Sequence, residues 1–312
     1  MNVDPSLLQR LGRLEFLARQ AVEGFITGLH KSPFHGFSVE FAEHRLYNPG
    51  ESTRHIDWKL YGRTDKLFVK RYEEETNLRC QLVLDCSGSM WYPSEVTPDG
   101  PELNKLKFAI HSCAALIELF RRQRDAVGLS VFADELESHI PAKSSGAHMR
   151  MIYHELEQLL DEVGNQRKGT STVEALHQIA EASPRRSLVI VFSDLLDRGG
   201  DIDELMAALQ HLRHNKHEVV LFHVLEGATE MDFSFQDRPT IFEDLETGEE
   251  IRLHPSEVRE AYQDRMAQLR KDLDVRCAQY RIDWVDVDIA SGIFPVLSSY
   301  LVKRAKMRGS RA

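Results

Sequence analysis

The chain of 312 residues has no long apolar run, since no window approaches the ~18 consecutive apolar residues of a membrane-spanning helix. Its first twenty residues carry an early acid and scattered arginines, whereas a secretory signal has a basic start and an apolar core. We therefore expect a protein without a membrane span, located in the cytoplasm.

Cysteine is scarce, and the charge balance is acidic. Cys80, Cys86, Cys113 and Cys277 include no C-x-x-C pair and no disulfide framework, which favours a reducing compartment. The net charge of −10 argues against general nucleic-acid binding, although it leaves a local basic patch open.

Three common catalytic signatures are also missing. The sequence contains no G-x-x-x-x-G-K-[ST] phosphate loop, no H-E-x-x-H helix and no G-x-S-x-G elbow. His211, His214 and His217 have the spacing of a zinc cluster, but cations near a helix C-terminus explain them better, since no matching Cys or carboxylate set accompanies them. His55 and Asp57 could form a catalytic pair, but structural hydrogen bonds are the simpler interpretation.

One stretch, QLVLDCSGSM at 81–90, organises what is present. Its apolar start ends abruptly at small polar residues, which predicts a buried parallel strand followed by a loop. Ligands of open α/β sheets bind beyond such strand ends. Asp85, Ser87 and Ser89 bring hard oxygen ligands there, as Mg²⁺ and Mn²⁺ accept, although an ordinary turn would use the same residue types.

Apolar strand-like runs alternate with amphipathic helical segments along most of the chain. The later runs are at 127–132, 187–192, 218–225 and 282–289, and 136–140 is expected to pair antiparallel beside the first of these. This alternation predicts an α/β fold, a Rossmann-like three-layer sandwich with a mostly parallel sheet and helices on both faces.

Residues 231–254 interrupt the alternation with two short β-like runs, 240–242 and 250–253, around Glu246-Thr247-Gly248. We predict a β-hairpin inserted in an α/β domain of residues 79–306. Residues 1–78 precede it as an amphipathic helix and a small β-rich extension. The extension mixes basic and aromatic residues as nucleic-acid binders do, but nearby acids cancel most of the charge, which favours structural ion pairs.

A longer pattern lies within that extension, between His44 and Tyr72. It reads His44-Arg45-x-Tyr47-x-Pro49-Gly50, then RHIDWK at 54–59, then Arg63, then Val69-Lys70-x-Tyr72. The pattern resembles the signature of the DUF58 family. The resemblance implies a von Willebrand factor A-type fold and a MoxR-type AAA+ ATPase as partner.

The resemblance also implies a metal-ion-dependent adhesion site. Its ligand positions fall on Asp85, Ser87 and Ser89, on Thr170 in the loop Lys168–Thr172, and on Asp194 after the SLVIVF run. Thr172 competes with Thr170, and Asp197 with Asp194, because sequence does not fix the loop register. With only two carboxylates, a bound Mg²⁺ or Mn²⁺ would keep positive charge and an open position for a partner's Glu or Asp.

The leading hypothesis is thus a non-enzymatic interaction protein, an adaptor or co-chaperone of a MoxR-type ATPase. Two alternatives stay open. A strand-end Asp with a second Asp could hold Mg²⁺ for a phosphohydrolase, although no general base is evident. The chain could also be a structural module with an empty metal site.

Overall fold

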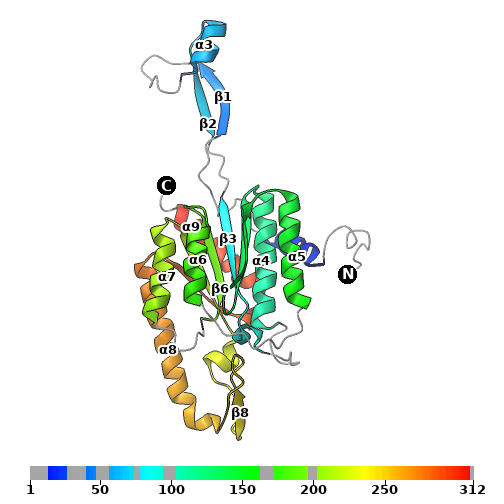
Figure 1. Cartoon of the computed structure of the whole chain (residues 1–312), viewed down its shortest axis with the longest axis vertical. Coiled ribbons are helices and arrows are strands. Elements are labelled where there is room, and N and C mark those ends of the chain that lie inside the picture. Colours follow the sequence, from blue (N-terminus) through cyan, green and yellow to red (C-terminus); the bar gives the residue numbers. More distant parts are fainter. Residues whose placement is uncertain are drawn as a thin grey trace. The chain divides into compact units, whose positions relative to one another are not determined.

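The structure is a computed structural model and describes residues 13–26, 40–46, 56–73, 78–93, 103–161, 172–195 and 202–309. The chain forms two compact units (Figure 1). The larger comprises Met1–Pro33 and Arg79–Ala312, and the smaller comprises Phe34–Leu78. The first helix, α2 (Arg13–Ile26), belongs to the larger unit. The division into domains at residue 79 stays a prediction.

A six-stranded sheet forms the centre of the larger unit, in the order β10-β7-β6-β3-β4-β5. Its strands are β3 (Arg79–Asp85), β4 (Ala126–Phe132), β5 (Leu136–Lys143), β6 (Leu188–Ser193), β7 (Glu218–Leu225) and β10 (Asp283–Asp288). All neighbours are parallel except β4 and β5, which pair antiparallel. The mixed sheet and its antiparallel edge strand confirm the predicted α/β arrangement.

Helices cover both faces of this sheet (Figure 1). One layer contains α4 (Lys105–Arg122), α5 (Gly146–Asp161) and α9 (Ile293–Gly309), with α2 packed on α4 and α5. The other layer contains α6 (Thr172–Ala182), α7 (Ile202–His214) and α8 (Pro255–Gln279). The result is a three-layer sandwich.

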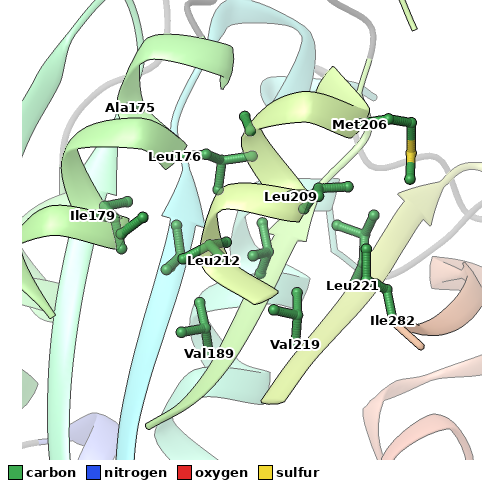
Figure 2. Close-up of a cluster of buried hydrophobic side chains, with 14 of the residues drawn as sticks. Ala175, Leu176, Ile179, Val189, Met206, Leu209, Leu212, Val219, Leu221 and Ile282 are labelled. Atoms are coloured by element: carbon green, nitrogen blue, oxygen red, sulfur yellow. The ribbon is translucent and has the colours of Figure 1, made fainter. Parts of the chain in front are cut away.

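Alternate residues of the central strands pack on opposite layers, because successive side chains of a strand point to opposite faces. Figure 2 shows Val189 and Val219 packed beneath Leu209 and Leu212 of α7. On the other face, Phe222 of β7 meets Tyr300 of α9 with ring centroids 5.2 Å apart. Strands buried on both faces need continuous apolar runs, which is why these runs were visible in the sequence.

The predicted hairpin is present. Strands β8 (Thr240–Glu243) and β9 (Glu250–Leu253) pair antiparallel, with Ile241 opposite Arg252 and Phe242 opposite Ile251. A short π-helical turn, η3 (Gly227–Met231), leads from β7 toward the hairpin, and α8 follows it. In Figure 1 the hairpin lies beyond the edge of the sheet at which β3 and β6 end.

The smaller unit contains β1 (Glu40–Leu46) paired antiparallel with β2 (Phe68–Glu73), and a helix, α3 (Trp58–Thr64), between them. The helix was not predicted in this β-rich segment. It begins there because the Asp57 carboxylate accepts hydrogen bonds from the Lys59 and Leu60 N–H groups, both at 3.0 Å. Asp57 thus has a structural role, whereas His55 lies outside the described residues.

Candidate functional site

The candidate site lies where the strand order of the sheet reverses, beside β3. The chain continues from β3 through α4 to β4, which pairs with one edge of β3, and β6 pairs later with the other edge of β3. In open α/β sheets such a reversal leaves a crevice at the carboxyl ends of the two strands concerned, and ligands bind there. Asp85 ends β3 and Ser193 ends β6, so both reach this crevice.

The Asp85 carboxylate, which is fully buried, joins the two strand ends. Its Oδ2 accepts a hydrogen bond from the Ser193 hydroxyl at 2.6 Å, and its Oδ1 accepts one from the Ser87 N–H at 2.9 Å. The Ser87 and Ser89 hydroxyl oxygens lie 3.1 Å apart at the start of η2 (Gly88–Trp91). The D-x-S-x-S motif therefore gathers one carboxylate and two hydroxyls at one point.

A second carboxylate, Asp194, influences the first. The pKa of Asp85 is raised from 3.8 to about 7, chiefly by burial and also by the nearby charge of Asp194, while the hydrogen bonds from Ser193 and Ser87 act to lower it. Asp194 is itself buried, with 1% of its surface exposed. Because two buried carboxylates that repel each other are stabilised by a positive charge, this pair favours a cation beside it.

One cation is already present, at a residue that was not predicted from the sequence. The Lys105 ammonium is completely buried and lies 2.6 Å from Asp194 Oδ2 and 2.5 Å from Glu230 Oε1. Burial alone would lower the pKa of Lys105, but the two carboxylates raise it above its usual range. Lys105 therefore stays charged and fixes the Asp194 side chain.

A lysine at the start of a helix is normally exposed to solvent, so the sequence gives no signal that Lys105 is buried. Lys105 is the first residue of α4, directly after Asn104, whose side chain caps the helix by accepting from the Lys107 N–H at 2.8 Å. The N-terminal end of a helix carries partial positive charge, so a buried ammonium there requires acidic partners from elsewhere in the chain.

Glu230 connects this ion pair to the hairpin region. Its Oε2 accepts from the Glu226 N–H at 2.7 Å, which fixes the side chain within η3. Burial raises the pKa of Glu230, and the Lys105 charge lowers it in opposition. The main-chain oxygen of Glu230 accepts from the Tyr262 hydroxyl of α8 at 2.9 Å. A continuous set of contacts thus runs from Asp194 through Lys105 and Glu230 to Tyr262.

His223 of β7 contacts the main chain of Asp194. Its Nε2 lies 3.1 Å from the Asp194 main-chain oxygen, and its Nδ1 lies 3.0 Å from Asp286 Oδ1. His223 therefore links the main chain that follows β6 to Asp286 of β10.

The predicted threonine ligand is only partly placed. Thr170 and Asp197 lie outside the described residues. Thr172 begins α6, is buried, and has a hydroxyl without a hydrogen-bond partner among the described residues. Within the described part of the chain, no group of three or more His, Cys, Asp and Glu side chains is arranged to hold a metal. The donors available here are instead two carboxylates with hydroxyls.

The three histidines near the end of α7 do not form a site. His211 Nδ1 lies 2.9 Å from His177 Nδ1, and its Nε2 lies 2.8 Å from Glu181. His217 is buried, and its Nδ1 accepts from the Ser187 N–H at 3.2 Å. His214 is exposed. Their separate environments agree with the expectation that they are not zinc ligands.

The chain belongs to the family described as protein of unknown function DUF58, which matches residues 43–272. Uncharacterized proteins of Mycobacterium tuberculosis and Mycobacterium bovis are 25% identical to it over 223 residues. The match covers 72% of this chain and 66% of those relatives, which is just under two thirds of their length.

Two solved structures match the chain at lower sequence identity. One is described as an aerotolerance-related membrane protein from Bacteroides fragilis, with 18% identity, a TM-score of 0.44, and coverage of 74% of this chain and 99% of that one. Another, BatB from Bacteroides thetaiotaomicron, has 18% identity, a TM-score of 0.40, and coverage of 73% and 99%. Among the residues described for the present chain, no helix combines the length and apolar character needed to cross a membrane.

Proposed function

We propose that this chain is a non-enzymatic interaction module that binds a protein partner through a divalent ion, Mg²⁺ or Mn²⁺. The ion would lie in a von Willebrand factor A-type adhesion site at the carboxyl edge of the sheet. The observation that carries the proposal is the meeting of Asp85, Ser87 and Ser89 with the Ser193-Asp194 end of β6.

The donor set suits a small hard cation. Mg²⁺ and Mn²⁺ prefer oxygen ligands, and Mg²⁺ usually retains several waters. Asp85 supplies charge, while Ser87 and Ser89 supply neutral oxygens close to it. Thr170 stays the proposed threonine ligand, and Thr172, whose hydroxyl has no hydrogen-bond partner among the described residues, is the alternative.

The contact of Lys105 with Asp194 gives the carboxylates of Asp85 and Asp194 different roles. Because the Lys105 ammonium contacts Asp194 directly, we assign Asp85 and the serines to the ion and Asp194 to support around it. The bound ion would supply an open coordination position with positive charge, which is what a partner's Glu or Asp requires. Asp85, Ser87 and Ser89 would orient that position at the crevice.

The partner follows from the family resemblance and is part of the proposal. We propose a MoxR-type AAA+ ATPase, with this chain as its adaptor or co-chaperone in the cytoplasm. ATP hydrolysis would come from that partner, because this sequence contains no phosphate loop of the Walker type.

The test begins with the ion alone. Isothermal titration of the full chain with Mn²⁺ and Mg²⁺ should give heat for the wild type and none for Asp85→Asn. Asparagine keeps one side-chain oxygen for the Ser87 N–H, so the fold should be retained. Asp134→Asn removes an equal charge from an exposed position after β4 and should bind as the wild type does.

The partner is tested second, with the purified MoxR-type ATPase of the source organism. Binding in biolayer interferometry should be lost with EDTA and with Asp85→Asn, and kept with Asp134→Asn. Binding that survives both EDTA and Asp85→Asn would remove the ion from the mechanism. Ion binding without any ATPase binding would overturn the choice of partner.

A further inference from the structure

The end of the sheet opposite the candidate ion site carries an exposed cation beside each of its six strands. The parallel strands begin at this end, and the antiparallel β5 finishes there, since Lys143 pairs with Val127 near the start of β4. In Figure 1 it is the end at which β3 begins, away from the hairpin. In the strand order β10, β7, β6, β3, β4 and β5, the cations are Arg281, Lys216, Arg186, Arg79, Arg124 and Lys143, and we call this row the basic edge.

Four of these cations share one backbone conformation. Each lies two residues before a strand, in the left-handed region. They are Arg124, Arg186, Lys216 and Arg281, with φ angles of 59°, 64°, 65° and 57°. A side chain other than hydrogen is disfavoured in that region, and glycine is the usual residue there. The repeated choice of a basic residue at a strained position indicates that the charge itself is used.

The electrostatics of helix ends do not account for the whole row. A cation near a helix C-terminus is stabilised by the helix dipole, which could explain single turns. Lys143, however, ends β5, which follows β4 directly. Arg79 is the first residue of β3, which β2 precedes in the chain. The row therefore follows the strands of the sheet and not the ends of its helices.

Acidic residues at the starts of the strands do not neutralise the basic edge. Glu218 and Asp283 contact the buried Arg304 guanidinium of α9, at 2.7 and 3.5 Å. Asp125 is itself buried, with 1% of its surface exposed. Within the described part of the chain, none of the six cations forms an ion pair or a side-chain hydrogen bond. The basic edge is therefore a band of uncompensated positive charge on a chain whose net charge is −10.

The end of α9 brings more positive charge to the same place. Because Arg304 contacts the first residues of β7 and β10, this helix reaches the basic edge. Lys303 beside it is exposed. The sequence that follows contains Lys306, Arg308 and Arg311. The chain thus carries further cations within a few residues of the basic edge.

The layout of the basic edge favours a flat anionic surface. Neighbouring strands lie about 4.8 Å apart, so six strands extend the row over about 24 Å. Proteins that bind single-stranded nucleic acid place aromatic side chains among their cations for base stacking. Of the described residues next to these six in sequence, Tyr280 alone is an exposed aromatic. A membrane of anionic lipids requires no stacking, because each Lys or Arg near its surface adds attraction by charge alone.

We propose that the basic edge binds the anionic surface of a phospholipid membrane. The inference does not depend on the proposed ion site. Strand β3 runs from the basic edge to Asp85 over seven residues, which is about 20 Å. A chain bound to lipid in this way holds the candidate ion site on the side away from the membrane, where a partner in solution reaches it.

The test is sedimentation of the full chain with lipid vesicles at about 0.1 M salt. Vesicles of phosphatidylcholine and phosphatidylglycerol in equal amounts should bind the chain, whereas vesicles of phosphatidylcholine alone should not. Raising the salt to about 1 M, where the Debye length falls to about 3 Å, should release it.

The left-handed turns provide a variant that keeps the fold. Glycine suits this backbone conformation, so the triple variant Arg124→Gly, Arg186→Gly and Arg281→Gly should unfold in urea no more readily than the wild type. Each cation near an anionic surface changes binding about fivefold, so this variant should bind the mixed vesicles about 100-fold more weakly.

A second triple variant controls for the change in net charge. Arg238→Gln, Arg252→Gln and Arg265→Gln remove three exposed arginines from the hairpin region and α8, away from the basic edge. This variant has the same net charge as the glycine variant, and it should bind the mixed vesicles as the wild type does.

Nucleic acid is the other polyanion to be measured, by fluorescence anisotropy of a labelled DNA duplex at the same salt concentration. Duplex binding that is tighter than vesicle binding, and that only the glycine variant loses, would replace the membrane by nucleic acid. The inference would also be overturned by no binding to the mixed vesicles, by equal binding to phosphatidylcholine alone, or by equal losses in the two triple variants.

Discussion

Replacement of Lys105 by methionine probes the ion pair at the centre of the site. Methionine keeps a long unbranched chain without the charge, so it fills most of the same space. In the native protein the ammonium is fully buried, 2.6 Å from Asp194 and 2.5 Å from Glu230. The variant leaves both carboxylates in place without this cation.

The expected loss is large because the charges are buried. Removing one member of a buried ion pair costs about 3–5 kcal/mol, chiefly because the remaining charge is uncompensated. Against a typical stability of about 5–15 kcal/mol, such a loss is easily measured. The loss should shrink as the pH falls, because burial raises the pKa of Glu230 and its protonation removes uncompensated charge.

The assay is urea unfolding followed by circular dichroism, with and without Mg²⁺. A divalent ion that binds only the folded state stabilises it by about 2.7 kcal/mol at 100 times its Kd. Lys105→Met makes the site more negative, so the ion should bind this variant more tightly and restore more stability than it adds to the wild type. Lys107→Met, at a half-buried position two residues along the same helix, should change stability by less than about 0.5 kcal/mol.

Two results would refute this reasoning. A loss for Lys105→Met as small as that for Lys107→Met would mean that the buried ion pair contributes nothing to folding. A Mg²⁺ effect no larger in Lys105→Met than in the wild type would mean that no cation site lies beside Asp194.

Three further predictions concern other parts of the same edge and sheet. The pKa of Asp85 is raised from 3.8 to about 7 in the folded state, so between these pH values the native protein retains a proton that the unfolded chain has lost. Without a bound ion, the free energy of unfolding should therefore decrease as the pH rises from about 4 to about 7. The Asp85→Asn variant should show a smaller decrease over the same pH range. Burial would raise the pKa of Asp286, but hydrogen bonds from His223 and Arg270 lower it from 3.8 to about 2. The Asp286→Asn variant should therefore be less stable than the wild type in urea unfolding at neutral pH. The difference in stability between the two proteins should vanish as the pH falls to about 2. The Gly128→Ala variant should be destabilised by about 1–3 kcal/mol in thermal or urea unfolding. A Cβ atom at this position would lie 2.5 Å from the Ile140 carbonyl oxygen and 2.8 Å from the Ala142 main-chain nitrogen. A variant as stable as the wild type would show that β5 shifts to accommodate the methyl group.

Much of the fold could be predicted because its strands are buried on both faces. The apolar runs at 187–192 and 218–225 predicted β6 and β7. The short β-like runs around Glu246-Thr247-Gly248 predicted the hairpin. The helix α3 was missed, because its start depends on the single cap at Asp57 within a segment that otherwise reads as β-rich.

The candidate site was predictable only in its local part. Asp85, Ser87 and Ser89 are neighbours in sequence, so their spacing alone places them together at one strand end. The Lys105–Glu230 contact joins residues separated by 125 positions. A single lysine at a helix start normally suggests a solvent-exposed residue, and only the folded arrangement of η3 beside α4 shows why this one is buried. Thr170, another expected ligand, lies outside the described residues and stays a prediction.

The most direct test of the central claim is an anomalous difference map from crystals of the full chain grown with Mn²⁺, with data collected near the manganese absorption edge. We predict one strong peak within coordination distance of the Ser87 and Ser89 hydroxyls and the Asp85 carboxylate, and its absence in Asp85→Asn crystals. A map without a peak at the shared end of β3 and β6, or with the same peak in the variant, would contradict the account.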